Sequence, residues 1–189
     1  MKKVLVVNGH PYAESYCSAL YQAVLENIDT GRCEVRAIDL GTLKFDPVLR
    51  MGYRHRMPED EEISYSQESV KWAEHIIFIY PIWFHSLPSL FKGWIDRVFA
   101  PKFAYNMHGI FVEKHLKGRS CHLIMTGDSP TLYNRLIPNS PIRLMKLHIM
   151  GMFGIKTTRV SILGHASLKD NQQGRERFLA RVAKIVGKL

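Results

Sequence analysis

The chain has 189 residues and a mass of 21.8 kDa, and 46% of its residues are hydrophobic. A chain of this length can bury roughly 70% of the surface that its unfolded form exposes, so it requires no disulfide or structural metal for stability. The composition excludes disorder of the whole chain and predicts a single domain over residues 1–189. The three cysteines, Cys17, Cys33 and Cys121, form no C-x-x-C pair, so we expect free thiols in a reducing compartment.

The net charge of +9 is distributed unevenly along the chain. Residues 1–100 contain 11 Lys and Arg against 13 Asp and Glu, a net charge of −2, whereas residues 101–189 contain 15 against 4, a net charge of +11. A basic half predicts an anionic partner, which is nucleic acid, membrane lipid or a phosphorylated small molecule. Composition alone does not distinguish these three kinds of partner.

The sequence contains no segment with the length of a membrane span. The apolar run Val4–Val7 ends at Asn8 and is too short for the apolar core of a signal peptide. The longest uncharged run, His75–Phe91, contains two prolines and falls short of the roughly 20 apolar residues that a spanning helix needs. We therefore expect a cytoplasmic protein that is not inserted in a membrane.

Short apolar runs rich in β-branched residues predict five buried strands, at Val4–Val7, Val35–Leu40, Ile76–Tyr80, His122–Thr126 and Arg159–Leu163. Apolar residues three or four positions apart predict amphipathic helices over residues 16–28, 90–98 and 178–189. This alternation predicts the α/β class, a doubly wound five-stranded parallel sheet with helices on both faces.

The segment Val48–Glu68 lies outside this alternation. It contains Arg50, Arg54 and Arg56, followed by the acidic run Glu59–Glu62. We interpret it as a surface excursion of the chain, and a lid is one role that such a segment can have.

In a sheet of this kind, ligands bind beyond the carboxyl ends of the strands. The loop after the first strand leads through His10 to the hydroxyls of Ser15 and Ser18, and a helix start of this composition predicts an anion site. The loop has neither a G-x-x-x-x-G-K nor a G-x-G-x-x-G motif. The alternative interpretation makes Ser15 only a helix cap and His10 only a turn residue.

Aromatic residues and prolines dominate the loop after the third strand. Pro81, Trp83, Phe84 and Pro88 fall within eight residues, which predicts a site for a flat heteroaromatic ligand. In the alternative interpretation Trp83 and Phe84 belong to the core. Trp94, on the helix that follows, is expected in the core.

The loop after the fourth strand is a turn by composition, Thr126-Gly127-Asp128-Ser129-Pro130, and Tyr133 follows it. An exposed tyrosine hydroxyl at this position is able to donate a proton, whereas Asp128 alternatively only caps the turn. The histidines lack metal-ligand spacing, and neither Ser86 nor Ser129 lies in a G-x-S-x-G motif, so we expect no metal site and no hydrolase triad.

Three sequence blocks occur together and in order: GHPYAESYCSAL, PIWFHSLPSLFKGWIDRVFAPKFAY and TGDSPTLY. With these blocks the chain resembles the NAD(P)H:quinone oxidoreductase family, whose members have a flavodoxin-like fold. The resemblance extends over nearly the whole chain. It implies a homodimeric flavoenzyme that passes two electrons as hydride from NAD(P)H to the flavin and then, after the nicotinamide has left, to a quinone-like acceptor, in ping-pong order.

The resemblance also implies site residues. Those that match the family's flavin phosphate loop are His10, Ser15, Tyr16, Cys17 and Ser18. Those that match the segment against the isoalloxazine ring are Pro81, Ile82, Trp83 and Phe84, and those that match the loop at its polar edge are Thr126, Gly127 and Asp128. The substrate pocket would be lined by Trp83 and, from the second subunit, by Tyr105 and Met107.

The chain departs from the family pattern in the third loop. The family often has T-T-G-G where this chain has Thr126-Gly127-Asp128-Ser129, which places a carboxylate near the flavin. Tyr133 matches a tyrosine proposed to stabilise the reduced flavin, so it is expected to be catalytic and to contact the cofactor. The histidine that accompanies this tyrosine in the family has no counterpart here, and Asn139 is nearest in register.

The expected cofactor is FAD, with FMN as the alternative, because Val48–Glu68 is long enough to cover an adenylate half. Two other functions remain open, a flavodoxin-like electron carrier and an oxidoreductase-type regulatory subunit of a potassium efflux system. The net charge of +9 argues against a small acidic carrier. We expect no nucleic-acid partner, because the basic residues of the last helix alternate with its apolar face: Arg175, Arg177, Arg181, Lys184 and Lys188.

Overall fold

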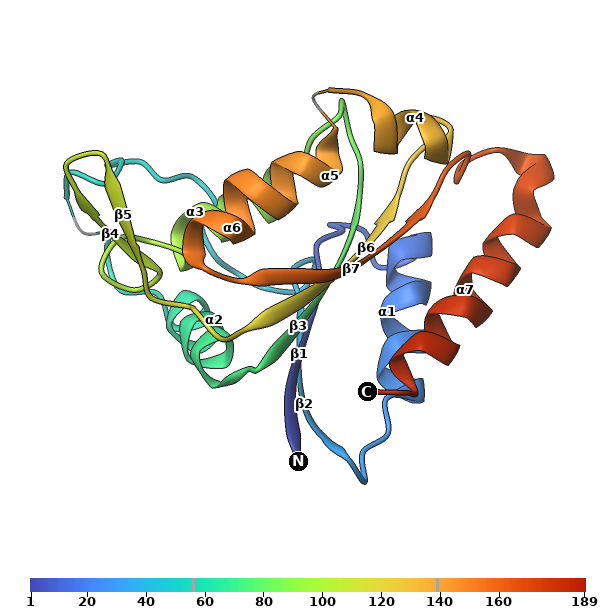
Figure 1. Ribbon diagram of the computed structural model, residues 1–189, viewed down its shortest axis with the longest axis horizontal. Coiled ribbons are helices and arrows are strands. Elements are labelled where there is room, and N and C mark those ends of the chain that lie inside the picture. The colour runs from blue at the N-terminus through green and yellow to red at the C-terminus, as the bar shows by residue number, and fades with distance from the viewer. Residues whose placement is uncertain (56, 139) are drawn as a thin grey trace.

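The structure is a computed structural model that describes residues 1–55, 57–138 and 140–189. A five-stranded parallel sheet in the order β2-β1-β3-β6-β7 lies at its centre (Figure 1). Its strands are β1 (Lys2–Asn8), β2 (Cys33–Asp39), β3 (His75–Pro81), β6 (Ser120–Thr126) and β7 (Lys156–Leu163). The chain moves outward from β1 first in one direction and then in the other, so its crossovers place helices on both faces. The predicted doubly wound α/β sheet is confirmed.

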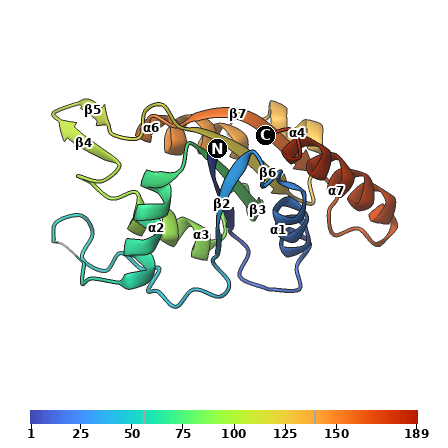
Figure 2. The same ribbon diagram turned by 90° about the horizontal axis from the view of Figure 1, so that it is seen from below.

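Helices cover both faces of the sheet (Figures 1 and 2). On one face α1 (Tyr16–Asn27) packs beside α7 (Gln172–Val186), and on the other lie α2 (Glu61–Trp72) and α3 (Ser89–Val98). Side chains of a strand alternate between faces, so Val4 and Val6 join the core under α1 and α7, whereas Leu5 and Val7 join the core under α2 and α3. Trp94 is fully buried in the second core, as the sequence predicts.

The structure contains elements that the sequence analysis missed. An antiparallel hairpin, β4 (Tyr105–His108) and β5 (Phe111–Lys114), follows α3. Helical segments precede and follow β7: α4 (Thr131–Leu136), α5 (Pro141–Arg143), the π-helix η1 (Leu144–Met150), α6 (Gly151–Phe153) and the 3-10 turn η2 (Lys169–Asn171). The hairpin strands are short and mostly exposed, so they leave no apolar run in the sequence. The π-helix departs from the 3.6-residue period, so it does not show the apolar spacing of an α-helix.

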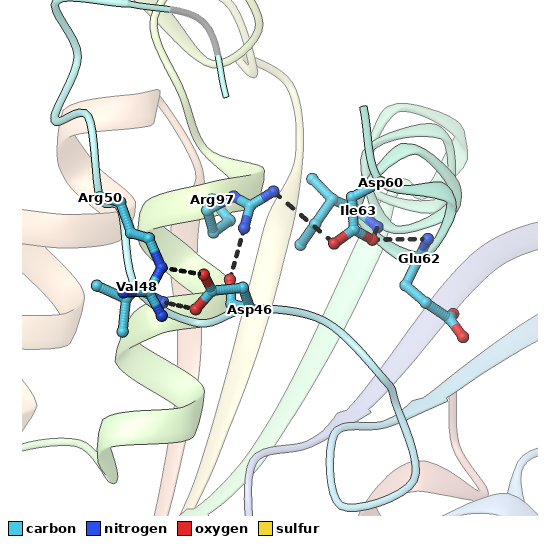
Figure 3. Close-up of polar contacts among 7 residues, drawn as sticks. All are labelled: Asp46, Val48, Arg50, Asp60, Glu62, Ile63 and Arg97. Atoms are coloured by element: carbon cyan, nitrogen blue, oxygen red, sulfur yellow. Dashed lines mark hydrogen bonds and ion pairs between the residues drawn. The ribbon is translucent and has the colours of Figure 1, made fainter. Parts of the chain in front are cut away.

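The predicted excursion Val48–Glu68 is only partly correct, because its last residues form the start of α2. Arg97 of α3, which is 6% exposed, holds the segment in place (Figure 3). Its Nη1 donates to the carbonyl of Asp46 at 2.5 Å, and its Nη2 lies 3.8 Å from the carboxylate of Asp60, which caps α2. Arg97 thus ties both ends of residues 46–60 to α3. Arg56 lies outside the described residues.

Two histidines are buried within the sheet. His75 lies 2.8 Å from the hydroxyl of Ser120, measured from its Nδ1, and His122 lies 2.9 Å from the hydroxyl of Ser161, measured from its Nε2. Burial lowers the pKa of His75 to about 4 and the pKa of His122 to about 3. Both imidazoles are therefore neutral in the folded protein at neutral pH.

We predict that acid destabilises the protein through these two histidines. Their folded-state pKa values lie below the ordinary 6.5, so the unfolded chain binds protons first, and stability is lost as the pH falls from about 6.5 toward 4. The loss is about 2 kcal/mol per histidine between pH 7 and pH 5. Urea unfolding across this range measures it. His122→Gln should show a shallower pH dependence than the wild type or the exposed control His148→Gln, and equal slopes would contradict the account.

A second prediction concerns Gly93, where α3 meets the 46–60 segment. A Cβ atom at this position would lie 2.4 Å from the carbonyl oxygen of Pro47. Gly93→Ala should therefore destabilise the protein by about 1–3 kcal/mol, although alanine normally stabilises a helix interior. Thermal unfolding of Gly93→Ala beside Ser89→Ala, an exposed position of the same helix, tests this. A stabilised Gly93→Ala variant would show that the contact is not tight.

Candidate functional site

Parallel pairing brings the loops after β1, β3 and β6 to one edge of the sheet. The rings of His10 and Trp83 lie 5.5 Å apart and connect the first loop to the second. The N–H of Ile82 donates to the carbonyl of Thr126 at 2.7 Å and connects the second loop to the third. Residues far apart in the sequence therefore lie together at one edge of the sheet.

Asn8, which the sequence analysis treated only as the end of a strand, organises the first loop. Its side chain is fully buried, and its amide donates to Ser18 at 3.2 Å and to Asp39 at 3.1 Å. Its Oδ1 accepts the N–H of His10 at 3.2 Å. Asn8 thus joins β1, β2, the first loop and α1. A polar residue ending an apolar strand was the only signal available in the sequence.

The start of α1 presents donors for an anion. Ser15 is the N-cap, and its hydroxyl accepts the N–H of Ser18 at 3.1 Å, so its capping role is confirmed. In the described part of the chain, the N–H groups of Tyr16 and Cys17 have no hydrogen-bond partner. Free N–H groups and the helix dipole together favour a bound anion.

The side chains of Tyr16 and Cys17 are occupied elsewhere. The Tyr16 hydroxyl donates to the carbonyl of Arg175 at 2.6 Å, and burial raises its pKa to about 12. The Cys17 thiol lies 3.4 Å from the hydroxyl of Thr126, and burial raises its pKa to about 11. A protonated, buried thiol is not a nucleophile, so both residues can serve a ligand only through their backbone. All three cysteines are free and buried.

His10 is a hydrogen-bond donor in its neutral form. Its Nδ1 accepts the N–H of Tyr12 at 3.0 Å, so the proton of the neutral ring resides on Nε2. Burial lowers the pKa of His10 below its ordinary value. The ring can therefore donate to a ligand at neutral pH without carrying a charge.

The second loop turns back on itself in two residues. Trp83 and Ser86 exchange both backbone hydrogen bonds, at 3.1 and 2.8 Å, while Phe84 (φ 49°) and His85 (φ 58°) occupy the left-handed region between them. The Phe84 side chain is 103% exposed and Trp83 is 42% exposed, so the alternative that these rings are core residues is wrong. Pro81 is the buried last residue of β3, and Ile82 is partly buried.

The third loop supplies polar groups. Asp128 accepts the N–H of Ser167 at 2.9 Å, so it does cap a turn, although that turn belongs to the loop after β7. Gly127 packs beside Ile82: a Cβ atom added at position 127 would lie 3.4 Å from the Cβ atom of Ile82. Thr126 is buried, while Tyr133 is 46% exposed at the start of the following helix. Asn139 lies outside the described residues.

Asn134 has an unsatisfied acceptor at this site. The residue is 1% exposed, and its Nδ2 donates to the carbonyls of Ser129 and Pro130 at 3.1 and 3.3 Å. Its Oδ1 has no hydrogen-bond partner. A buried acceptor without a donor costs free energy, so this oxygen is a departure from the usual pairing of buried polar groups. The sequence contains no signal that identifies Asn134.

A cavity of about 380 Å³ lies between the second and third loops. It is lined by Ile82, Trp83, Phe84, His85, Gly127, Asp128, Ser129 and Asn134. Its volume is within the range of small-molecule sites. A larger cavity, of about 630 Å³, lies under residues 49–67 and contains none of the predicted site residues. We place the functional site at the smaller cavity, because it lies where the parallel strands end and its rim carries the exposed rings of Trp83 and Phe84.

Two of the predicted substrate-pocket residues lie apart from this cavity. Tyr105 and Met107 are on β4. Tyr105 is 8% exposed and stacks on Phe153 at 5.9 Å, so it supports the hairpin from within and offers little surface to a ligand. Met107 is exposed. Among the described residues, no group of three or more His, Cys, Asp or Glu side chains is arranged to hold a metal ion, and no helix is long and apolar enough to span a bilayer.

The left-handed turn yields a prediction about stability. Phe84 makes no buried contact and has an unfavourable backbone conformation, whereas asparagine tolerates φ above zero. Phe84→Asn should therefore stabilise the protein by about 0.5–1 kcal/mol, measured by urea unfolding, while weakening the binding of an aromatic ligand. Leu132→Asn, an exposed position with helical backbone, is the control that should not stabilise. A destabilised Phe84→Asn variant would contradict the strain argument.

Comparison with known proteins agrees with this geometry. A family model described as flavodoxin-like fold matches residues 2–186. Ribosyldihydronicotinamide dehydrogenase [quinone] from Pongo abelii is 25% identical over 202 residues, which cover 92% of this chain and 87% of that protein. The crystal structure of Smu.1420 from Streptococcus mutans UA159 has a TM-score of 0.83 at 29% identity and covers 99% of this chain and 100% of that one.

A third match shares the fold at lower identity. NAD(P)H:quinone oxidoreductase from Methanothermobacter marburgensis has a TM-score of 0.79 at 20% identity, and the match covers 98% of both chains. The resemblance to NAD(P)H:quinone oxidoreductases that the sequence blocks indicated is thus confirmed. The sheet order, the strand-end site and the match over residues 2–186 lead to one conclusion: the chain belongs to the flavodoxin-like fold family.

Proposed function

We propose that the chain is a flavin-dependent NAD(P)H oxidoreductase that reduces quinone-like acceptors. The observation that carries the proposal is the combination, at one sheet edge, of a helix start with free N–H groups and a cavity rimmed by exposed aromatic rings. The curated relative from Pongo abelii is named for quinone reduction with a dihydronicotinamide. A flavin nucleotide has a phosphate and a flat ring, and each of these has a counterpart among the residues present.

The phosphate of the flavin would lie at the start of α1. The Ser15 hydroxyl and the free N–H groups of Tyr16 and Cys17 would hold it, with the Nε2–H of His10 as a further donor. The buried Ser18 would support this loop, because its hydroxyl donates to the carbonyl of Tyr12 at 3.1 Å. None of these groups requires a positive charge, so binding of the phosphate depends on preorganised dipoles. The network of Asn8 keeps them in position.

The ring would occupy the cavity between the second and third loops. Trp83 and Phe84 would contact its face, and Ile82 would pack against it from within. Gly127 and Asp128 would line its polar edge, and the buried Thr126 would support this loop from below. When bound, the flavin supplies hydride acceptance and donation; the chain's own residues orient the ring, exclude water from one side and hold protons.

We propose FMN as the flavin, in place of the FAD expected from the sequence. That expectation assumed that Val48–Glu68 covers an adenylate half. Arg97 instead ties residues 46–60 to α3, on the face of the sheet opposite α1, and residues 61–68 belong to α2 (Figures 2 and 3). Residues 48–68 are therefore not placed to contact the adenylate half of an FAD bound at the start of α1.

A homodimer is part of the proposal. The hairpin β4–β5 presents large apolar side chains to solvent, namely Met107, Ile110 and Phe111. Apolar side chains grouped on one projection favour a protein interface. A second copy that packed on this hairpin would receive Met107 near its own cavity, as the resemblance to the family implies.

Charge and thiol state support the choice of co-substrate and compartment. The net charge of +11 over residues 101–189 favours the approach of phosphorylated NAD(P)H. The free, buried cysteines agree with a cytoplasmic location. Tyr133, exposed beside the cavity, is the proposed contact for the reduced cofactor.

This proposal predicts both the cofactor and the kinetic pattern. Acid release from the purified protein should yield FMN without FAD, identified by chromatography.

Steady-state rates measured against NADPH at several quinone concentrations should give parallel double-reciprocal lines, because the nicotinamide leaves before the acceptor binds. Raising the ionic strength should increase the KM for NADPH more than the KM for an uncharged quinone.

The outcomes that would contradict the proposal are specific. Release of FAD alone would reverse the choice of flavin, and intersecting lines would exclude ping-pong order. A protein that binds flavin but is not reduced by NADPH or NADH in a stopped-flow measurement would instead be an electron carrier of the flavodoxin type.

A further inference from the structure

A histidine that the sequence analysis did not assign to the site lies in the wall of the cavity. His85 follows Phe84 in the left-handed turn, and its ring lies 5.5 Å from that of Tyr133, tilted by 58°. The pair connects the second loop to α4, two segments almost 50 positions apart in the sequence. The histidine that accompanies this tyrosine in the family has no counterpart here, and Asn139 is nearest in register. An imidazole next to Tyr133 therefore comes from another loop.

The conformation of His85 is unusual for its residue type. Its φ of 58° places it in the left-handed region, directly after a phenylalanine with φ of 49°. Two consecutive left-handed residues normally call for glycine or asparagine. Strained backbone of this kind is concentrated at functional sites, where the surrounding structure maintains it. Here the paired backbone bonds of Trp83 and Ser86 maintain the turn and direct the His85 ring to the cavity.

His85 is also the one imidazole among the residues that line this cavity. The titratable groups that face it are the Asp128 carboxylate, in the same cavity wall, and the Tyr133 phenol, in ring contact. Asp128 is partly occupied, because it accepts the N–H of Ser167. An imidazole is the side chain suited to exchanging protons near neutral pH.

We propose that His85 is a catalytic residue that delivers the proton needed for reduction of the acceptor, with Tyr133 as a positioning residue that holds the imidazole at the cavity. The inference rests on the proposed function.

Reduction of a quinone to a hydroquinone requires two electrons and two protons. In the proposed reaction both electrons and one proton would come from the hydride that NAD(P)H supplies. The second proton would leave a ring nitrogen of His85, so that one N–H bond breaks and one O–H bond forms on the quinone. Water then returns a proton to the imidazole.

The test compares an acceptor that needs a proton with one that does not. Ferricyanide takes single electrons and no proton, whereas menadione takes two electrons and two protons. In His85→Asn, the rate constant for reoxidation of the reduced protein by menadione should fall by about 10- to 100-fold, and that for ferricyanide should change less than about twofold. The menadione rate of the wild type should depend on pH, because the imidazole supplies the proton, and this dependence should be absent from the variant.

The variant and its control are matched to the backbone. Asparagine tolerates the left-handed conformation, so His85→Asn keeps the turn, and an unchanged midpoint of urea unfolding verifies this. His165, with φ of 53° and outside the cavity, provides the control His165→Asn, which should leave both rates and the pH profile unchanged. Tyr133→Leu, which removes the ring in contact with His85, should shift the pH profile without abolishing the difference between the two acceptors.

The result that would overturn the inference is an equal effect of His85→Asn on both acceptors, or none on either, with the pH dependence retained. Failure of the proposed function is distinguishable from this. In that case the wild type itself, after mixing with NADPH, reduces neither menadione nor ferricyanide.

Discussion

Parallel pairing of β1, β3 and β6 is the constraint on which the site depends. These strands run in the same direction, so their carboxyl ends meet at one edge of the sheet. The three loops that line the candidate site each follow one of these ends. Asn8 converts this placement into a defined loop, since it joins β1 to β2, to the first loop and to α1. The donors at the start of α1 and the aromatic rim of the cavity would not face the same ligand without that arrangement.

The strain in the second loop and the polar atom left unsatisfied in α4 share one explanation. A protein selected only for stability would place glycine or asparagine at positions 84 and 85 and would pair the Asn134 oxygen. Both departures lie in the wall of the same cavity. Free energy is lost at the site and is compensated by the two cores beneath it, which is the usual relation between a binding edge and its scaffold.

The sequence predicted the sheet and its loops well, because buried parallel strands leave continuous apolar runs such as Ile76–Tyr80. It also identified Ser15 as a cap and Trp94 as core. It could not predict His85 beside Tyr133 or the free oxygen of Asn134, because each depends on a tertiary contact between segments without any shared pattern. Arg97 was missed for the same reason, and with it the course of residues 46–60, on which the expectation of FAD depended.

The uneven charge also acquires a structural meaning. β6 and β7, in the basic half, are hydrogen-bonded into the same sheet as β1–β3, so the change in charge at residue 100 marks no boundary between separate sheets. α7 places basic residues beside α1, on the face of the sheet that includes the proposed phosphate site. A phosphate held by neutral dipoles would thus lie in a positive surrounding field.

The central claim is that the start of α1 holds a flavin phosphate while the cavity holds the ring. Calorimetric titration of the flavin-free protein with FMN and with riboflavin, which lacks the phosphate, tests it most directly. The account predicts that FMN binds at least about 30-fold more tightly, equivalent to about 2 kcal/mol, and that Ser15→Ala removes much of the difference without abolishing riboflavin binding. Equal affinities for the two flavins, or a difference that Ser15→Ala leaves intact, would contradict it.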